Sequence, residues 1–235
     1  MPTTRSQSRR EEAVKGTEVD TEVKGEDVEV KEDSETATTK PEPDTGTARK
    51  QDSPSNPLFT IGHSTHPLSD FLSLLTSNGI TTVVDVRKLP GSNKFPWFNA
   101  DPLRASLAEI GIALARIEPL NGRRPVSRTV PLDVNAWWTN RSFHNYADHA
   151  LGPEFRHGLD ELLRLDEGGR VAVMCAEAVW WRCHRRIIAD HVIAAGREVV
   201  HIIDAHPAKP ATISLGAVVR EDGSVVYPAA RKRRK

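Results

Sequence analysis

Short apolar runs alternate with amphipathic helical segments along residues 57–227, and this alternation restricts the possible fold more than any other feature of the chain. Strands that alternate with helices require parallel crossover connections. We therefore predict an α/β domain with a single doubly wound, mostly parallel five-stranded sheet, followed by a small β-hairpin at 218–226 with Asp222-Gly223 at its turn. The predicted strands are 58–61, 80–86, 112–117, 171–174 and 198–203, and the predicted helices are 67–78, 102–110, 144–150, 153–165 and 183–195.

The two ends of the chain differ from this region in composition. Residues 1–56 contain no aromatic residue, nine Lys or Arg and fourteen Asp or Glu, so we predict a disordered acidic tail. Residues 228–235 form a basic tail, which is compatible with a nuclear-import signal, a phosphate-contacting segment or a solvated end. No run resembles a signal peptide or reaches transmembrane length, so we expect a soluble intracellular protein, cytoplasmic or nuclear, with no membrane partner.

The predicted domain, residues 57–227, has eighteen acidic and eighteen basic residues. Generic nucleic-acid binding is typical of strongly basic domains, so this balance does not support it, although a local basic patch remains compatible with it. The chain has only two cysteines, which argues against a disulfide framework in an intracellular protein.

Polar side chains follow the predicted strands at the points where they end. In an open parallel sheet, ligands bind outside the carboxyl ends of the strands, so these residues are candidates for one site. Packing alone does not require so many reactive side chains at these positions. The polar residues that follow the strand ends are His63 and Ser64, Asp85 and Arg87, Glu118, Cys175 and Glu177, and Asp204 and His206.

Both cysteines fall in one strand–loop–helix segment. Cys175 follows the apolar run 171–174, and Cys183 opens a predicted helix. Unpaired N–H groups at a helix start and nearby arginines lower a thiol's pKa, which favours a reactive thiolate. The alternative is that both cysteines only pack. With His184 and His63 they could ligate a metal, but the spacing Cys-x7-Cys-His matches no usual zinc site, and we expect no metal and no cofactor.

All five tryptophans stand next to another aromatic residue, in Trp97-Phe98, Trp137-Trp138 and Trp180-Trp181. Such rings could wall a pocket or stack on a base, with Arg123, Arg124 and Arg182 available for phosphate. The alternative is that they cover the core. Trp180 and Trp181 are the strongest candidates for binding because they lie between the two thiols.

Six motifs together resemble the family called domain of unknown function 488, over about residues 58–205. The resemblance implies an α/β fold and directs attention to His63, Asp85, Arg87, Cys175, Glu177 and the Cys183-His184-Arg185 triplet. A weaker likeness is to rhodanese-type sulfurtransferases, from which the glycine-free loop after Cys175 departs. The six motifs are Thr60-Ile-Gly-His-Ser64, Val84-Asp-Val-Arg87, Pro90-Gly-Ser92, Tyr146-Ala-Asp148, Met174-Cys-Ala-Glu177 and Cys183-His-Arg185.

These residues suggest three functions. The first is an enzyme that uses Cys175 as nucleophile or sulfur carrier on a small anionic or nucleotide-like substrate, with His63 or His184 moving protons. The second uses the carboxylates of Glu177 and Asp85 on a nucleotide or glycosidic bond, and the third is a non-catalytic nucleotide or nucleic-acid module. The predicted catalytic residues are Cys175, Cys183, His63, Asp85 and Glu177, and the predicted substrate-binding residues are Arg87, His184, Arg185, Trp180 and Trp181.

Overall fold

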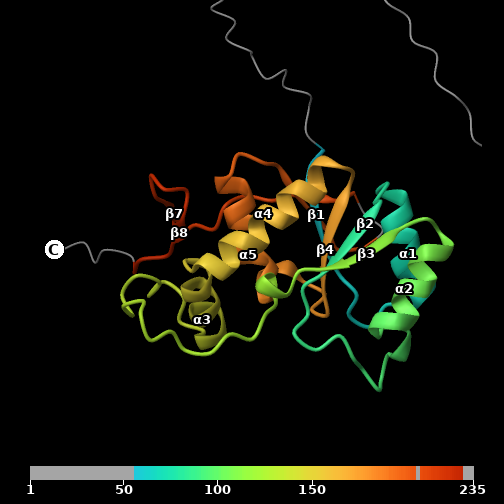
Figure 1. Ribbon diagram of the computed structural model, residues 1–235, viewed down its shortest axis with the longest axis horizontal. Coiled ribbons are helices and arrows are strands. Elements are labelled where there is room, and N and C mark those ends of the chain that lie inside the picture. Colours follow the sequence, from blue (N-terminus) through green and yellow to red (C-terminus); the bar gives the residue numbers. More distant parts are fainter. Residues whose placement is uncertain (1–55, 205–206, 230–235) are drawn as a thin grey trace, which may run out of the picture. The chain divides into compact units, whose positions relative to one another are not determined.

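The structure, a computed structural model, describes residues 56–204 and 207–229. The predicted disorder of the N-terminal tail and the predicted role of the terminal basic cluster concern residues that lie outside this description. The described part holds a six-stranded sheet with helices on both faces and a separate two-stranded hairpin (Figure 1). The strands are β1 (Leu58–Gly62), β2 (Thr82–Asp85), β3 (Ala113–Arg116), β4 (Val171–Cys175), β5 (Val199–Ile202), β6 (Lys209–Pro210), β7 (Val218–Val219) and β8 (Val225–Val226). The α-helices are α1 (Leu68–Ser77), α2 (Ala100–Glu109), α3 (Arg141–Ala150), α4 (Pro153–Glu167) and α5 (Arg185–Ala194).

The order of strands in the large sheet is β3-β2-β4-β1-β5-β6. The first five strands run parallel, which confirms the predicted α/β fold with its mostly parallel sheet. The two-residue strand β6 pairs antiparallel with β5 and was not predicted, since it contains Pro210 and is too short to leave a pattern in the sequence. The predicted hairpin is also present as β7 and β8, with Gly223 at a φ of 77° in its turn.

Helices cover the two faces of the sheet in two groups, and each group has its own core. On one face α1 and α2 pack Phe71 and Leu103 against strand residues such as Ile61. On the other face α3, α4 and α5 pack Tyr146 and Ile187, among others, against the strands (Figure 1). Right-handed crossovers explain this division, because the chain moves from β1 to β2 to β3 in one direction and from β3 to β4 to β5 in the other.

The reversal of direction opens a crevice at the carboxyl ends of β2 and β4. These two strands are neighbours, yet β2 leads away toward β3 and β4 leads away toward β5. The loops that follow them therefore diverge, and such a switch point is where open α/β sheets bind ligands. Cys175 lies at this point and Asp85 ends the neighbouring strand.

The hairpin is tied to the domain by Tyr227, which is fully buried. Its hydroxyl donates a hydrogen bond of 2.8 Å to Asp190 on α5, and its backbone N–H donates to the Asn135 side chain at 3.0 Å. Among the described residues, no helix has the length and apolar character needed to cross a membrane.

Candidate functional site

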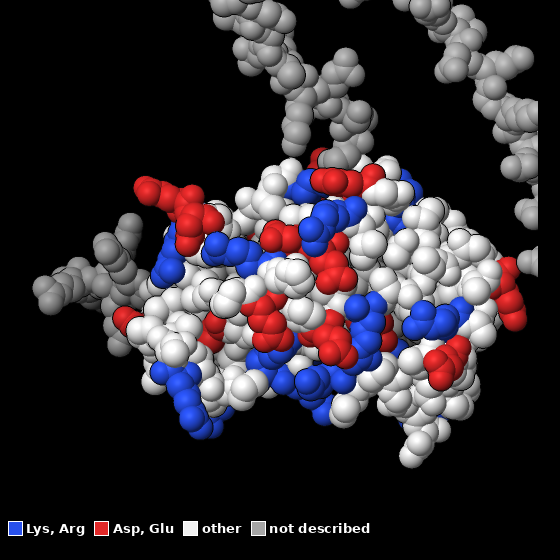
Figure 2. Space-filling model, in the orientation of Figure 1, with Lys and Arg blue, Asp and Glu red and all other residues white. Residues whose placement is uncertain are grey.

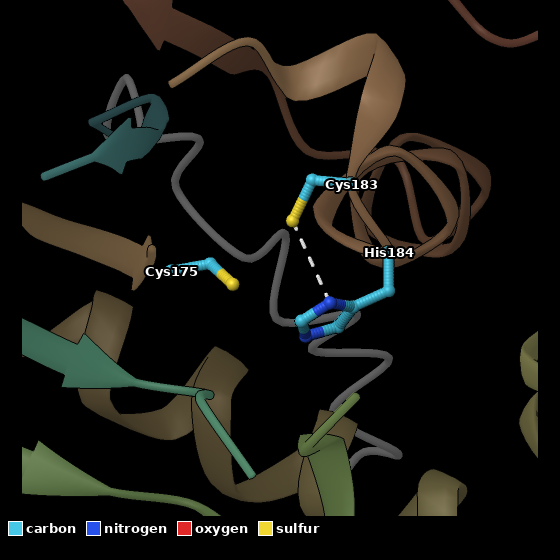
Figure 3. A group of neighbouring side chains, drawn as sticks. All are labelled: Cys175, Cys183 and His184. Atoms are coloured by element: carbon cyan, nitrogen blue, oxygen red, sulfur yellow. Dashed lines mark hydrogen bonds between the residues drawn. The ribbon is translucent and has the colours of Figure 1, made fainter. Parts of the chain in front are cut away.

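Two free thiols and an imidazole meet at the switch point. Cys175 ends β4, whereas Cys183 and His184 come from the turn that precedes α5, and one donor atom from each lies within 4.8 Å of the others (Figure 3). The Cys183 sulfur is 3.5 Å from His184 Nδ1. The predicted helix start at Cys183 is two residues early, since α5 begins at Arg185 and a 3-10 turn, Trp180–Arg182, precedes Cys183.

The His184 ring is fixed on several sides. Its Nε2 lies 3.2 Å from the carbonyl oxygen of Val86, so Nε2 carries a hydrogen and Nδ1 faces the Cys183 thiol with a lone pair. The ring packs on Tyr146 with centroids 4.9 Å apart. A Cβ at Gly122 would stand 2.8 Å from Nδ1, so a glycine is needed where this loop passes the imidazole. This geometry allows a proton to pass from Cys183 to His184.

The pKa values of the two thiols shift in opposite directions. The Cys175 thiol donates a hydrogen bond to the Cys183 sulfur, which lowers the pKa of Cys183 well below its ordinary value, and His184 and Arg185 lower it further. Arg185 Nε lies 3.4 Å from the same sulfur. The pKa of Cys175 is raised by that hydrogen bond and by burial. The predicted low pKa therefore holds for Cys183, whereas for Cys175 the prediction is wrong, because the two sulfurs compete for a single negative charge.

His63, Asp85 and Arg87 form a buried network beside this cluster. Arg87 pairs with Asp85 at 2.7 Å and also donates to His63 Nε2 at 3.1 Å and to the Phe98 carbonyl at 2.8 Å. His63 Nδ1 lies 3.2 Å from the Ser64 carbonyl, and the ring stacks on Phe98. Burial and the charge of Arg87 lower the pKa of His63 to about 4. Both of its nitrogens are engaged, so the geometry fits a neutral support for Arg87 better than a proton carrier.

A cavity of about 350 Å³ opens beside the thiols. Lys88, Arg123 and Arg182 lie exposed on its lining, and no ion pair in the described part of the chain involves them. Glu177 is the one acidic residue among the described lining residues. Figure 2 shows Lys and Arg side chains gathered at the lower middle of the surface, the side to which the strands' carboxyl ends point in Figure 1. The cavity thus suits a small anion with an apolar part, because Phe143 and Tyr146 form one wall.

Some of the predicted site residues do not face this cavity. Arg185 is only 1% exposed and donates to the backbone carbonyls of Glu177 and Ala178, so it is not available to hold a substrate. Trp180 stacks on His201 with centroids 4.2 Å apart, and Trp181 is 45% exposed. Neither tryptophan belongs to the lining of the cavity.

Other residues of the site left little or no signal in the sequence. Lys88 resembled an ordinary exposed loop lysine, and Gly122 gave no signal because its role depends on the distant His184 ring. Tyr146 occurs in one of the family motifs, but its place beside His184 depends on how α3 packs. Arg123, which was among the predicted phosphate contacts, adopts a positive φ of 58° at the cavity.

Of the described residues, only Cys175, Cys183 and His184 bring three potential metal ligands this close together. Thiolate and imidazole donors are the ligands that soft ions such as zinc prefer. A bound metal would occupy both sulfurs, so metal binding and free-thiol chemistry are competing uses of the cluster.

One comparison with known proteins gave a match. The family model described as "Domain of unknown function DUF488" matches residues 67–192, more than half of the chain. This range contains Asp85, Arg87, Cys175, Cys183 and His184, whereas His63 lies just before it. No match was found among curated proteins or among solved structures.

Proposed function

The chain belongs to the DUF488 family, and we propose that it is a cysteine-dependent enzyme that acts on a small anionic substrate. One observation carries the proposal: the Cys183 sulfur lies 3.5 Å from His184 Nδ1 and 3.4 Å from Arg185 Nε, on the lining of a cavity whose exposed cations form no ion pair with any described residue. A thiolate stabilised in this way is a strong nucleophile at neutral pH.

Each group around the cavity then has a distinct task. His184 accepts the Cys183 proton and can return it to a leaving group, with its tautomer fixed by the Val86 carbonyl. Arg185 stabilises the negative sulfur from the buried side. Lys88, Arg123 and Arg182 attract the anion and orient it. Because the base His184 and the cation of Arg185 both contact the Cys183 sulfur, we assign the nucleophile to Cys183 rather than to Cys175. The lowered pKa of Cys183 agrees with this choice.

The geometry favours this function over the two alternatives. Carboxylate chemistry needs two free carboxylates, but Asp85 is buried in its ion pair with Arg87, which leaves Glu177 alone at the cavity. A nucleotide-stacking module built on the tryptophan pair needs those rings at the ligand, yet Trp180 packs on His201 and neither tryptophan lines the cavity. The likeness to rhodanese-type sulfurtransferases does not carry the proposal, because it would make the strand-end Cys175 the nucleophile and because the glycine-free loop after Cys175 departs from that pattern.

Alkylation tests the proposal without a known substrate. We expect iodoacetamide to modify Cys183 rapidly at pH 7, where an ordinary thiol of pKa about 8.5 is mostly protonated. The cations at the cavity should raise the rate of alkylation by negatively charged iodoacetate relative to the rate with iodoacetamide. This ratio of rates should fall in Lys88→Ala, in Arg123→Ala and at high salt. Lys94→Ala, at an exposed lysine outside the cavity lining, is the matched control.

Two results would contradict the proposed function. The first is a pair of thiols that stay inert until denaturant is added, which would leave the cysteines as packing residues. The second is one zinc ion per chain that is lost in Cys183→Ser and His184→Ala, which would make the cluster a metal site.

A further inference from the structure

The proposed function uses Cys183 as the nucleophile and His184 as its base, and it gives the second cysteine, Cys175, no chemical role. Cys175 lines the same cavity as Cys183, is only half buried, and has its sulfur within 4.8 Å of the Cys183 sulfur. A serine, threonine or backbone N–H would serve equally well as a hydrogen-bond donor to Cys183. A second sulfur at this place therefore points to sulfur chemistry.

A neighbouring thiol is useful only for one kind of adduct on the nucleophile. Acyl, phosphoryl or glycosyl groups on a cysteine are removed by water, and a second thiol adds nothing to that step. An adduct that is bound to the nucleophilic cysteine through a second sulfur atom is different, because a neighbouring thiol can remove it by thiol–disulfide exchange. The pair thus indicates an electrophile whose reacting atom is sulfur, and the exposed Lys88, Arg123 and Arg182 indicate that its leaving part is an anion.

Building on the proposed role of Cys183, we propose that Cys175 is the resolving thiol of a two-cysteine relay and that the substrate is an anionic sulfane-sulfur donor of the thiosulfate type. In the first step the Cys183 thiolate attacks the outer sulfur of the donor. A sulfur–sulfur bond forms on Cys183, the donor's sulfur–sulfur bond breaks, and sulfite leaves with the bonding pair. Cys183 then carries a persulfide.

In the second step the Cys175 sulfur attacks the Cys183 sulfur. The new bond is a Cys175–Cys183 disulfide, and the outer sulfur leaves as hydrosulfide with the bonding pair and the Cys175 proton. The two cysteines are oxidised and the sulfane sulfur is reduced, so the electrons balance. A thiol reductant from outside returns the disulfide to two thiols and completes the cycle.

The surroundings of Cys175 suit this sequence of steps. The pKa of Cys175 is raised chiefly by its hydrogen bond to Cys183, with burial second. The first cause weakens in the persulfide, because the negative charge has then moved from the Cys183 sulfur to the outer sulfur. The loop after Cys175 is held in place at Gly62, whose position leaves no room for a Cβ beside the Glu177 carbonyl. Cys175 thus stays beside Cys183 while its reactivity rises at the step where it is needed.

The test uses the full chain, reduced and then freed of reductant, with thiosulfate. Wild type should release one sulfite and one hydrosulfide per protein and lose the mass of two hydrogen atoms as the disulfide forms. Cys175→Ser should release one sulfite and no hydrosulfide, and should keep the mass of one added sulfur atom. Cys183→Ser should release sulfite at least about a hundredfold more slowly. With dithiothreitol, wild type should turn over repeatedly.

The possible failures are distinguishable. If Cys183 is alkylated rapidly but no variant releases sulfite, or if Cys175→Ser releases hydrosulfide as fast as wild type without reductant, the relay is wrong and the proposed function stands. A disulfide that forms with hydrogen peroxide but not with thiosulfate would overturn the substrate class. If Cys183 is inert to iodoacetamide, both proposals fall.

Discussion

At the scale of single residues, the position of the His184 ring depends on the absence of a side chain at Gly122. A Cβ there would stand 2.8 Å from Nδ1 and 2.9 Å from Cε1, closer than real contacts allow. We therefore predict that Gly122→Ala displaces the imidazole from Cys183 and slows alkylation of Cys183 at pH 7 about tenfold, because a thiol pKa that rises by about one unit lowers the thiolate fraction about tenfold. Measuring the rate against pH should show the apparent thiol pKa moving upward.

The control for this prediction is Gly91→Ala, because a Cβ at Gly91 would meet open space. That variant should keep the wild-type rate. Far-UV circular dichroism should show both variants folded. An unchanged rate in Gly122→Ala would mean that His184 does not activate Cys183.

Residue chemistry could be predicted in part from the sequence. Local patterns predict Cys175 at a strand end and Cys183 at a helix start, although the helix begins two residues later. The rule that parallel strands end at one edge of a sheet also predicts Asp85 near Cys175. The sign of the Cys175 pKa shift could not be predicted, since it depends on a sulfur eight positions away that only folding brings near. The burial of Arg185 was missed for a similar reason, because its partners are backbone carbonyls of the preceding loop.

At the scale of elements, α3 supplies one wall of the cavity and begins at a side-chain cap. The Asn140 carboxamide oxygen accepts hydrogen bonds from the backbone N–H groups of Ser142 and Phe143, at 2.9 and 3.4 Å. We predict that Asn140→Ala lowers the free energy of unfolding by about 1 kcal/mol, because two N–H groups at the helix start lose their acceptor. Asn140→Ser, which keeps an acceptor, should lie close to wild type. Urea denaturation with an unchanged slope would measure both, and equal losses in the two variants would contradict the capping role.

Element boundaries follow the sequence closely where a helix has a clear apolar face. The helix predicted to stop at Asn78-Gly79 is α1, which ends at Ser77. The predictions deviate where a tertiary contact replaces the local signal. The helix predicted to begin at Cys183 is α5, which begins two residues later at Arg185. A separate 3-10 turn, Trp180–Arg182, lies before it, and in that turn Trp180 is held by its stacking on His201.

At the scale of the whole molecule, the order of the strands decides which residues meet, and no local pattern contains it. The placement of β4 between β2 and β1 brings Cys175 beside the loop that follows Asp85. The sequence predicted five parallel strands, but it could not show that β2 and β4 are the neighbours whose loops diverge. The sequence therefore predicts a cavity at the carboxyl edge of the sheet, but it does not predict where along that edge the cavity lies.

The last prediction concerns the minimal folding unit. Val225 and Tyr227 at the end of the described chain are fully buried, and Tyr227 bonds to Asp190 and Asn135, whereas residues 228–229 are exposed. A fragment of residues 57–227 should therefore unfold cooperatively with the same midpoint as the full chain. A fragment of residues 57–216 should lose on the order of 5 kcal/mol, because burial of an apolar side chain contributes about 1.5–3 kcal/mol and several are removed. Thermal unfolding followed by circular dichroism tests both, and limited proteolysis tests the tail. If residues 1–56 resist protease as well as the domain does, or if the shorter fragment matches the longer one in stability, the boundaries are wrong.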